Sequence, residues 1–156
     1  MSPIAPGTPA PEFRLITEKG KEFTQDDLRG HTTVLVFYPF AFSPVCTDQL
    51  NVYNEVLDEF EAAGARLFGV SCDASWSQKA FREKLGVSIE QLSDFEPKGR
   101  TARAFGAYFA PGGMTNRALV IVGPDGVVRW SHLADSPGDL PGVGLIFDGL
   151  AASTVS

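Results

Sequence analysis

The chain has 156 residues, about the length of one domain. Hydrophobic residues make up 44% and charged residues 21%, as in ordinary globular proteins, which excludes wholesale disorder and low-complexity repeats. The formal net charge of −6 disfavours a nucleic-acid or anionic-membrane binder, because both need clustered positive charge.

The N-terminal stretch from Met1 to Pro11 carries four prolines, no basic start and no apolar core, so we do not expect a signal peptide. A strand follows over Glu12–Thr17, then a turn, and Thr24 is a candidate N-cap for one short helical turn. The β-branched and aromatic run Thr32–Tyr38 indicates a strand that is buried on both faces.

The second part of the chain alternates between helices and strands. We expect an irregular loop over Pro39–Pro44, a helix from Cys46 to Phe60, a strand at 66–71, a helix at 75–85 stopped by Gly86, a helix within 94–105, a hairpin of strands 117–122 and 127–132, and a terminal helix at 143–152. Trp76, Phe81 and Trp130 are interpreted as core residues.

The resulting order is β-β-α-β-α-β-α-β-β-α. Strand–helix–strand units give parallel pairs, and the late hairpin adds an antiparallel pair. We therefore expect a single domain over residues 1–156, an α/β thioredoxin-like fold with a mixed central sheet and helices on both faces. The longest apolar run, 34–42, is interrupted by Pro39 and is far shorter than the roughly 18 residues of a membrane span. We expect a cytoplasmic protein without a membrane partner.

The two cysteines, Cys46 and Cys72, are too few for a disulfide framework, and with two scattered histidines they predict no metal site and no cofactor. Cys46 follows a buried strand and a proline-containing loop, and it opens a helix. The free N–H groups of a helix N-terminus favour a thiolate over a thiol. Most isolated cysteines are core residues, but this setting favours a functional Cys46.

Pro39, Ser43 and Cys46 match the pattern Pro-x-x-x-Thr/Ser-x-x-Cys, and the chain resembles the peroxiredoxin family, closest to its AhpE-like one-cysteine type. Further similar segments are 7–15, 71–73, 92–95 and Asn116-Arg117, so the resemblance covers about residues 3–135. It implies a thiol-dependent peroxidase that reduces hydrogen peroxide or organic hydroperoxides.

The resemblance also implies roles for residues. The Cys46 thiolate attacks the peroxide and becomes a sulfenic acid. Arg117 stabilises the thiolate and the departing oxygen, although a surface salt bridge is the alternative for this arginine. Ser43 and the backbone N–H groups of Val45 and Cys46 complete a polar pocket, and Pro39 shields it from water.

Two positions depart from the usual family pattern. Ser43 stands where most members have Thr, and Gln49 stands where many have Glu, which leaves a hydrogen-bonding group that cannot be an ionic partner of an arginine. Cys72 is interpreted as a structural thiol, with an atypical resolving role as the alternative. We therefore expect an external low-molecular-weight thiol or a redoxin to regenerate Cys46.

Phe40 and Phe42 are aromatic residues in the active-site loop. They predict a hydrophobic patch, with Phe42 also lining the substrate site. The resemblance to peroxiredoxins implies that the chain pairs through this region, so we expect a homodimer near this loop. Two other functions remain open at this point. One is a thiol-disulfide or glutathione-peroxidase-like reductase on the same fold, and the other is a redox sensor or chaperone-like protein that uses Cys46 as a switch.

Overall fold

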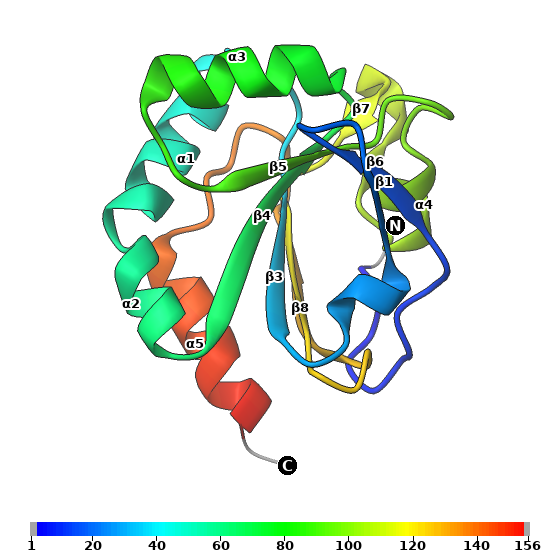
Figure 1. Ribbon diagram of the computed structural model, residues 1–156, viewed down its shortest axis with the longest axis vertical. Helices are drawn as coiled ribbons and strands as arrows, with labels where there is room; N and C mark the ends of the chain where they lie inside the picture. Colours follow the sequence, from blue (N-terminus) through cyan, green and yellow to red (C-terminus); the bar gives the residue numbers. More distant parts are fainter. Residues whose placement is uncertain (1–2, 155–156) are drawn as a thin grey trace.

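A computed structural model describes residues 3–154, so the ends of the predicted domain, residues 1–2 and 155–156, lie outside the described part. Within that part, seven strands form one mixed sheet in the order β2-β1-β5-β4-β3-β8-β9 (Figure 1). The strands are β1 Arg14–Thr17, β2 Glu22–Thr24, β3 Thr32–Phe37, β4 Ala65–Ser71, β5 Glu90–Ser93, β8 Ala118–Val122 and β9 Val128–Leu133, and a separate small hairpin is formed by β6 Tyr108–Phe109 and β7 Met114–Thr115. The helices are α1 Pro44–Glu55, α2 Leu57–Ala62, α3 Ser75–Leu85, α4 Arg100–Ala104 and α5 Val143–Thr154, with short 3₁₀ turns η1 Gln25–Leu28 and η2 Ala110–Gly112.

The strand directions bring the loop after β3 and residue Arg117 to the same edge of the sheet. β3 and β5 both run parallel to β4, so the carboxyl ends of the three strands meet at this edge. β8 runs antiparallel to β3, and its first residue, Ala118, pairs with Phe37, the last residue of β3. Arg117 therefore lies at the same edge as the loop that follows β3, although the two are far apart in the sequence. The expected mixed α/β sheet is confirmed.

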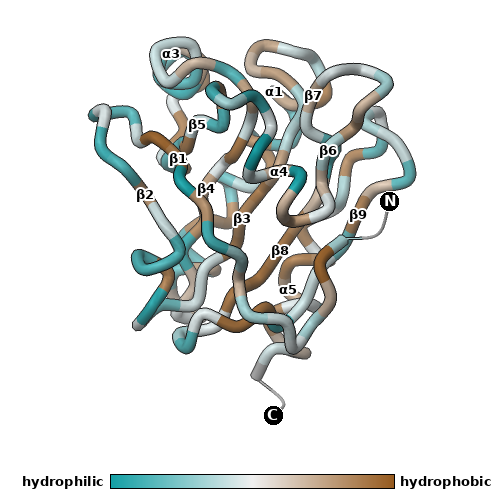
Figure 2. The backbone as a smooth tube through the Cα atoms, turned by 90° about the vertical axis from the view of Figure 1, so that its right-hand side faces the viewer, coloured by the Kyte–Doolittle hydropathy of each residue, from teal (hydrophilic) through white to brown (hydrophobic). Residues whose placement is uncertain are grey.

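Two hydrophobic clusters cover the two faces of the sheet. Successive residues of β3 alternate between them, with Val34 and Val36 in one cluster and Leu35 and Phe37 in the other. α1, α2, α3 and α5 pack on the first face, while α4 and η1 cover the second (Figure 1). Figure 2 shows the hydrophobic colours concentrated along β3, β4 and β8, the strands that are buried on both faces.

Helix ends followed the sequence signals where a glycine marks them and departed elsewhere. α3 covers the expected residues and ends at Gly86, whose φ of 69° is left-handed and favours glycine. The helix expected from Cys46 to Phe60 is two helices, because the chain leaves helical geometry at Val56, with φ −114° and ψ 15°. Neither glycine nor proline stands at this break, so composition carries no signal for it.

Two short helical segments agree with the sequence. Thr24 is the N-cap of the predicted helical turn, which is the 3₁₀ turn η1 at Gln25–Leu28, and Phe23 just before it lies in β2, paired with Leu15. The helix predicted within 94–105 is α4. The Asp94 carboxylate accepts the backbone N–H groups of Thr101 and Ala102 at 3.0 and 2.9 Å, and it thus satisfies the free donors of the first turn.

Trp76 is not a core residue, contrary to the sequence interpretation. Its side chain is 80% exposed on α3, whereas Phe81 on the same helix is fully buried and Trp130 packs partly against the core. The two α3 positions lie five residues apart, which turns them to different sides of the helix.

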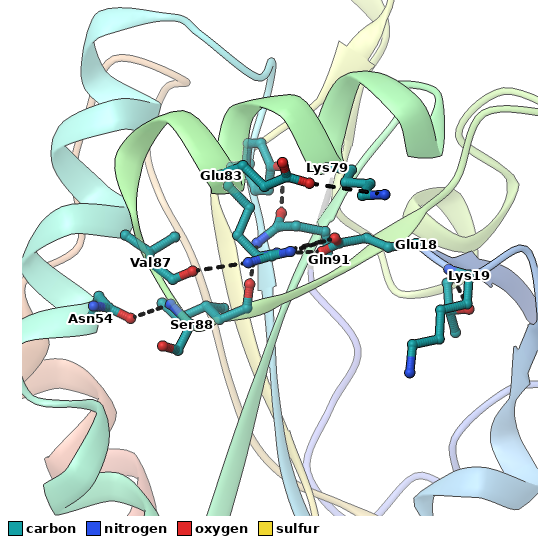
Figure 3. A network of polar contacts seen from close by, with 12 residues as sticks. Glu18, Lys19, Asn54, Lys79, Glu83, Val87, Ser88 and Gln91 are labelled. Carbon is teal, nitrogen blue, oxygen red and sulfur yellow. Dashed lines mark hydrogen bonds and ion pairs between the residues drawn. The ribbon is translucent and has the colours of Figure 1, made fainter.

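A polar network holds the end of β3 in place on its helix-rich face. The Tyr38 hydroxyl, fully buried, donates to Gln91 Oε1 at 2.6 Å, and Gln91 Nε2 donates to the carbonyl of Ile89 at 2.8 Å. Close by, Arg82 of α3 pairs with Glu18 at 2.8 Å (Figure 3). These contacts tie the residue before the active-site loop to β5. None of the described helices is long and apolar enough to cross a bilayer.

Candidate active site

Cys46 lies in the first turn of α1, at the carboxyl end of β3. The helix begins two residues earlier than expected, with Ser43 as N-cap and Pro44 as its first residue. Proline suits that position because it has no N–H to leave unsatisfied. Cys46 is fully buried, so its sulfur is shielded from bulk water at a helix end that presents free N–H groups.

The structure places Arg117 directly against this sulfur. Its Nη2 lies 3.1 Å from Cys46 Sγ, across 71 positions of sequence. Arg117 is only 2% exposed and forms no ion pair with any carboxylate among residues 3–154, which excludes a surface salt bridge. A buried cation without an anion is costly, so this guanidinium favours a negative charge on the sulfur beside it.

The other guanidinium nitrogens bind neutral acceptors. Nη1 donates to Gln49 Oε1 at 2.8 Å, and Nε donates to the backbone carbonyl of Pro137. Gln49 Nε2 in turn donates to the Tyr53 hydroxyl at 3.2 Å, and that hydroxyl donates to the carbonyl of Pro141. Burial raises the pKa of Tyr53 to about 12, against the lowering effects of Gln49 and Arg117, so the hydroxyl keeps its proton at neutral pH.

The active-site loop is held by its own contacts. The Ser43 hydroxyl donates to the carbonyl of Phe40 at 3.0 Å, and the backbone N–H of Ala41 donates to Asp73 Oδ2 at 2.8 Å. Phe42 adopts a left-handed φ of 71° that is rare for a bulky residue, and its ring lies 5.2 Å from that of Phe81.

The other predicted site residues lie in and around this loop. Pro39 is buried at its start, and Val45 is half-buried in the first turn of α1. The Ser43 proton is engaged with the loop itself, so only the lone pairs of its oxygen remain to face a hydrogen-bond donor. Phe42 is 51% exposed beside the site.

Cys72 belongs to a different environment. It is buried in the cluster on the opposite face of the sheet from Cys46, and its sulfur contacts the Thr115 hydroxyl at 3.3 Å. Burial raises the pKa of the Cys72 thiol, and the hydrogen bond from Thr115 opposes that shift only in part. The neutral thiol is therefore the favoured form of Cys72, and the sheet separates it from the site.

Three parts of the site were not found from the sequence. Tyr53 belongs to the apolar repeat that predicts the helix after Cys46, and nothing in that repeat marks it as polar in function, although its spacing of four from Gln49 places the two side chains on one side of α1. The carbonyls of the loop 134–142 carry no sequence signal, because every residue has one. Asp73 was part of a family-like Ser-x-Asp segment, and its contact with Ala41 follows from the neighbouring ends of β3 and β4.

Comparison with known proteins agrees with this arrangement. The model of the AhpC/TSA family matches residues 6–131. Alkyl hydroperoxide reductase E of Mycobacterium tuberculosis is 31% identical over 149 residues, covering 95% of this chain and 97% of the relative. A peroxiredoxin of Thermotoga petrophila is 34% identical over 128 residues, covering 79% of this chain and 60% of the relative. The crystal structure of AhpC from Enterococcus faecalis superposes with a TM-score of 0.85 at 25% identity, covering 95% and 91% of the two chains.

The thioredoxin-like sheet therefore has a precedent among solved structures. The chain belongs to the AhpC/TSA family, the peroxiredoxins. It is a thiol-dependent peroxidase, and the resemblance stated from Pro39, Ser43 and Cys46 is confirmed at the level of the family and its activity.

Proposed function

We propose that Cys46 is the peroxidatic cysteine and that Arg117 is its catalytic partner. One observation carries this assignment: the buried Arg117 guanidinium touches Cys46 Sγ at 3.1 Å and has no carboxylate to neutralise it within residues 3–154. The thiolate is the anion that this cation lacks. Cysteine is a nucleophile only as a thiolate, so the contact serves reactivity.

The chemistry at this pair is a displacement at a peroxide oxygen. The Cys46 sulfur donates an electron pair to one oxygen, a sulfur–oxygen bond forms and the oxygen–oxygen bond breaks. The departing oxygen leaves with the bonding electrons as hydroxide or alkoxide and takes up a proton, and the sulfur is oxidised to a sulfenic acid. Arg117 stabilises the negative charge as it moves from sulfur to the departing oxygen.

The loop residues have supporting roles in this proposal. The Val45 and Cys46 N–H groups of the first helical turn and the hydroxyl oxygen of Ser43 contact the peroxide. Pro39, which is buried and has no N–H, keeps the loop start rigid and dry. Phe42 lines the entrance. Hydrogen peroxide and organic hydroperoxides are the proposed substrates, in line with a relative named alkyl hydroperoxide reductase E.

An external thiol or a redoxin is the proposed reductant. Cys46 and Cys72 are the two cysteines of the sequence, and they lie on opposite faces of the central sheet. A disulfide needs Cα atoms within about 7 Å, and a direct bond across the sheet would require the fold to open. A thiol from outside the chain therefore attacks the sulfenic sulfur, which forms a mixed disulfide and releases the oxygen as water. A second thiol then attacks the mixed disulfide, so that reduced Cys46 is released and the two external thiols leave joined by a disulfide.

Residues 1–156 are proposed to act as one cytoplasmic domain that pairs into a homodimer. Both hydrophobic clusters flank a single sheet, which supports one domain. Exposed aromatic side chains follow the carboxyl ends of three neighbouring strands: Phe40 and Phe42 after β3, Trp76 after β4 and Phe95 after β5. Their exposure next to the active site supports a second copy of the chain as the partner of this surface.

Replacing each cysteine separately tests the assignment. Cys46→Ser should abolish the continuous consumption of peroxide in the presence of excess thiol, because serine is not ionised at neutral pH. Cys72→Ser should retain most of the rate, since Cys72 lies in the cluster on the far face of the sheet, where its sulfur contacts Thr115. Intact-mass analysis after one equivalent of peroxide without thiol should show one added oxygen on Cys46. Equal losses in both variants, or a Cys46–Cys72 disulfide as the main product, would contradict the assignment.

A further inference from the structure

The Tyr53 hydroxyl sits between two groups of opposite hydrogen-bonding character. Its oxygen lies within hydrogen-bond distance of the Pro141 carbonyl and 3.2 Å from Gln49 Nε2, and the residue is fully buried. A backbone carbonyl can only accept, so the single hydroxyl proton must point to Pro141. The lone pairs of the Tyr53 oxygen are then left to accept from Gln49.

This order of donors decides which way the Gln49 amide faces. The two ends of a glutamine amide have the same shape, and hydrogen bonds alone distinguish them. Because Tyr53 accepts the NH₂ end, the carbonyl end is turned to Arg117 Nη1, which it meets at 2.8 Å. The opposite orientation would set two donors against each other beside a buried cation.

We propose that Tyr53 is a positioning residue of the peroxidase site: by fixing the orientation of the Gln49 amide, it holds the Arg117 guanidinium against Cys46. The inference rests on the proposed roles of Cys46 and Arg117. It adds Tyr53 as the residue that, through Gln49, keeps the Arg117 guanidinium in its position against Cys46. It also includes the loop 134–142, whose carbonyls at Pro137 and Pro141 bind the two ends of the network.

Each guanidinium nitrogen that faces the site has a separate partner. Nη2 meets Cys46, Nη1 meets Gln49 and Nε meets Pro137, so the planar fork has one allowed position. The raised pKa of Tyr53 keeps the hydroxyl protonated over the neutral range, as the donor order requires. Because burial excludes water from Gln49 and Tyr53, no solvent molecule replaces a lost contact without a structural change.

The sequence of hydrogen bonds from Gln49 to Tyr53 and from Tyr53 to Pro141 explains why position 49 carries glutamine here rather than glutamate. A carboxylate has no N–H to offer to the Tyr53 oxygen. It would compete with Pro141 for the one hydroxyl proton, and one of the two acceptors would lose its donor. Tyr53 and Gln49 are therefore a matched pair, and a change at one position calls for a change at the other.

Tyr53→Phe removes the hydroxyl and keeps the ring. In a Cys72→Ser background, we expect the second-order rate constant with hydrogen peroxide to fall by about threefold to tenfold, the effect of one buried hydrogen bond. The pH profile of Cys46 alkylation by iodoacetamide should move to higher pH, because a displaced guanidinium stabilises the thiolate less. Tyr108→Phe is the control: Tyr108 is also a buried tyrosine but belongs to the cluster on the opposite face of the sheet from Cys46, so rate and profile should stay as in the parent.

A second substitution tests the mechanism itself. In Tyr53→Phe, adding Gln49→Glu should raise the rate again, because both carboxylate oxygens can accept from Arg117 and no orientation needs to be fixed. A double variant no faster than Tyr53→Phe would overturn the orientation argument. So would a Tyr53→Phe protein that matches Tyr108→Phe in both rate and alkylation profile.

Two further variants separate the possible failures. If Arg117→Ala slows the reaction and Tyr53→Phe does not, only this inference fails. If Arg117→Ala reacts like the parent, the proposed site itself is wrong. Should Tyr53→Phe not fold, Gln49→Glu alone carries the test: its carboxylate should draw the Tyr53 proton from Pro141 and speed amide hydrogen exchange in the loop 134–142. Unchanged exchange there would overturn the proposal.

Discussion

At the scale of single residues, environment separates side chains of one type. Cys46 lies against a buried guanidinium at a helix N-terminus, whereas Cys72 contacts a neutral hydroxyl in an apolar cluster. Burial alone disfavours a thiolate, and a nearby cation favours it. The same chemical group thus lies beside a buried cation on one face of the sheet and beside a neutral hydroxyl on the other.

The buried Tyr53 hydroxyl predicts a pH dependence of stability. Its pKa rises from 10.0 to about 12 on folding, so between these values the unfolded chain releases the proton and the folded chain does not. The free energy of unfolding should therefore be unaffected by Tyr53 below about pH 10 and fall above it, by up to about 1.4 kcal/mol per pH unit. In Tyr53→Phe, this fall in the free energy of unfolding above about pH 10 should be absent.

Urea denaturation of both proteins at about pH 9 and pH 11 measures the difference. The gap in unfolding free energy between the parent and Tyr53→Phe should shrink or reverse at the higher pH, while contributions from other groups are common to both proteins and cancel. A gap that is equal at both pH values would show that Tyr53 ionises as freely in the folded protein as in the unfolded chain.

At the scale of elements, α5 shows why a helix can contain glycine. Gly144 and Gly149 are poor helix formers, so local propensity alone favours a helix at 143–152 only weakly. A Cβ added at Gly149 would lie 2.6 Å from the Trp130 ring and 2.9 Å from Ile121. Glycine at 149 therefore lets α5 approach β8 and β9 closely, and packing offsets its low helix propensity.

These contacts predict opposite effects of alanine at the two glycines. Gly149→Ala should lower the unfolding free energy by about 1–3 kcal/mol, because a rigid indole and a buried isoleucine must move. Gly144→Ala meets nothing within 4 Å and should be neutral or stabilising by up to about 1 kcal/mol. Thermal denaturation of the two variants provides the comparison, and a stabilised Gly149→Ala protein would disprove the close approach.

At the scale of the whole molecule, the exposed aromatic residues beside the active site predict the assembly. Trp76→Glu places a charge at the side chain that is 80% exposed, so we expect the proposed dimer to dissociate into monomers. Val52→Glu is the control, since Val52 is an exposed apolar residue of α1 outside the group Phe40, Phe42, Trp76 and Phe95. Sedimentation velocity measures both variants, and a Trp76→Glu protein with the sedimentation coefficient of the parent would place the interface elsewhere.

Much of the fold and part of the site could be predicted from local patterns. Buried strands such as Thr32–Phe37 have continuous β-branched and aromatic residues, and α3 ends at a glycine with left-handed geometry. Patterns failed where distant groups decide the outcome. Asp94 caps α4 through space, the break at Val56 has no compositional mark, and Trp76 lies on the exposed side of its helix.

The sequence by itself determined the family and singled out Cys46 and Arg117 as a candidate pair, because these depend on residue types at short, fixed spacings. Only the tertiary structure decided that Cys72 lies across the sheet, that Arg117 binds Gln49 and Pro137, and that Tyr53 joins Gln49 to Pro141. The physical reason is that hydrogen bonds require a donor and an acceptor within about 3 Å at a suitable angle. Strand register and helix packing set such distances between residues far apart in the chain, and no local pattern records them.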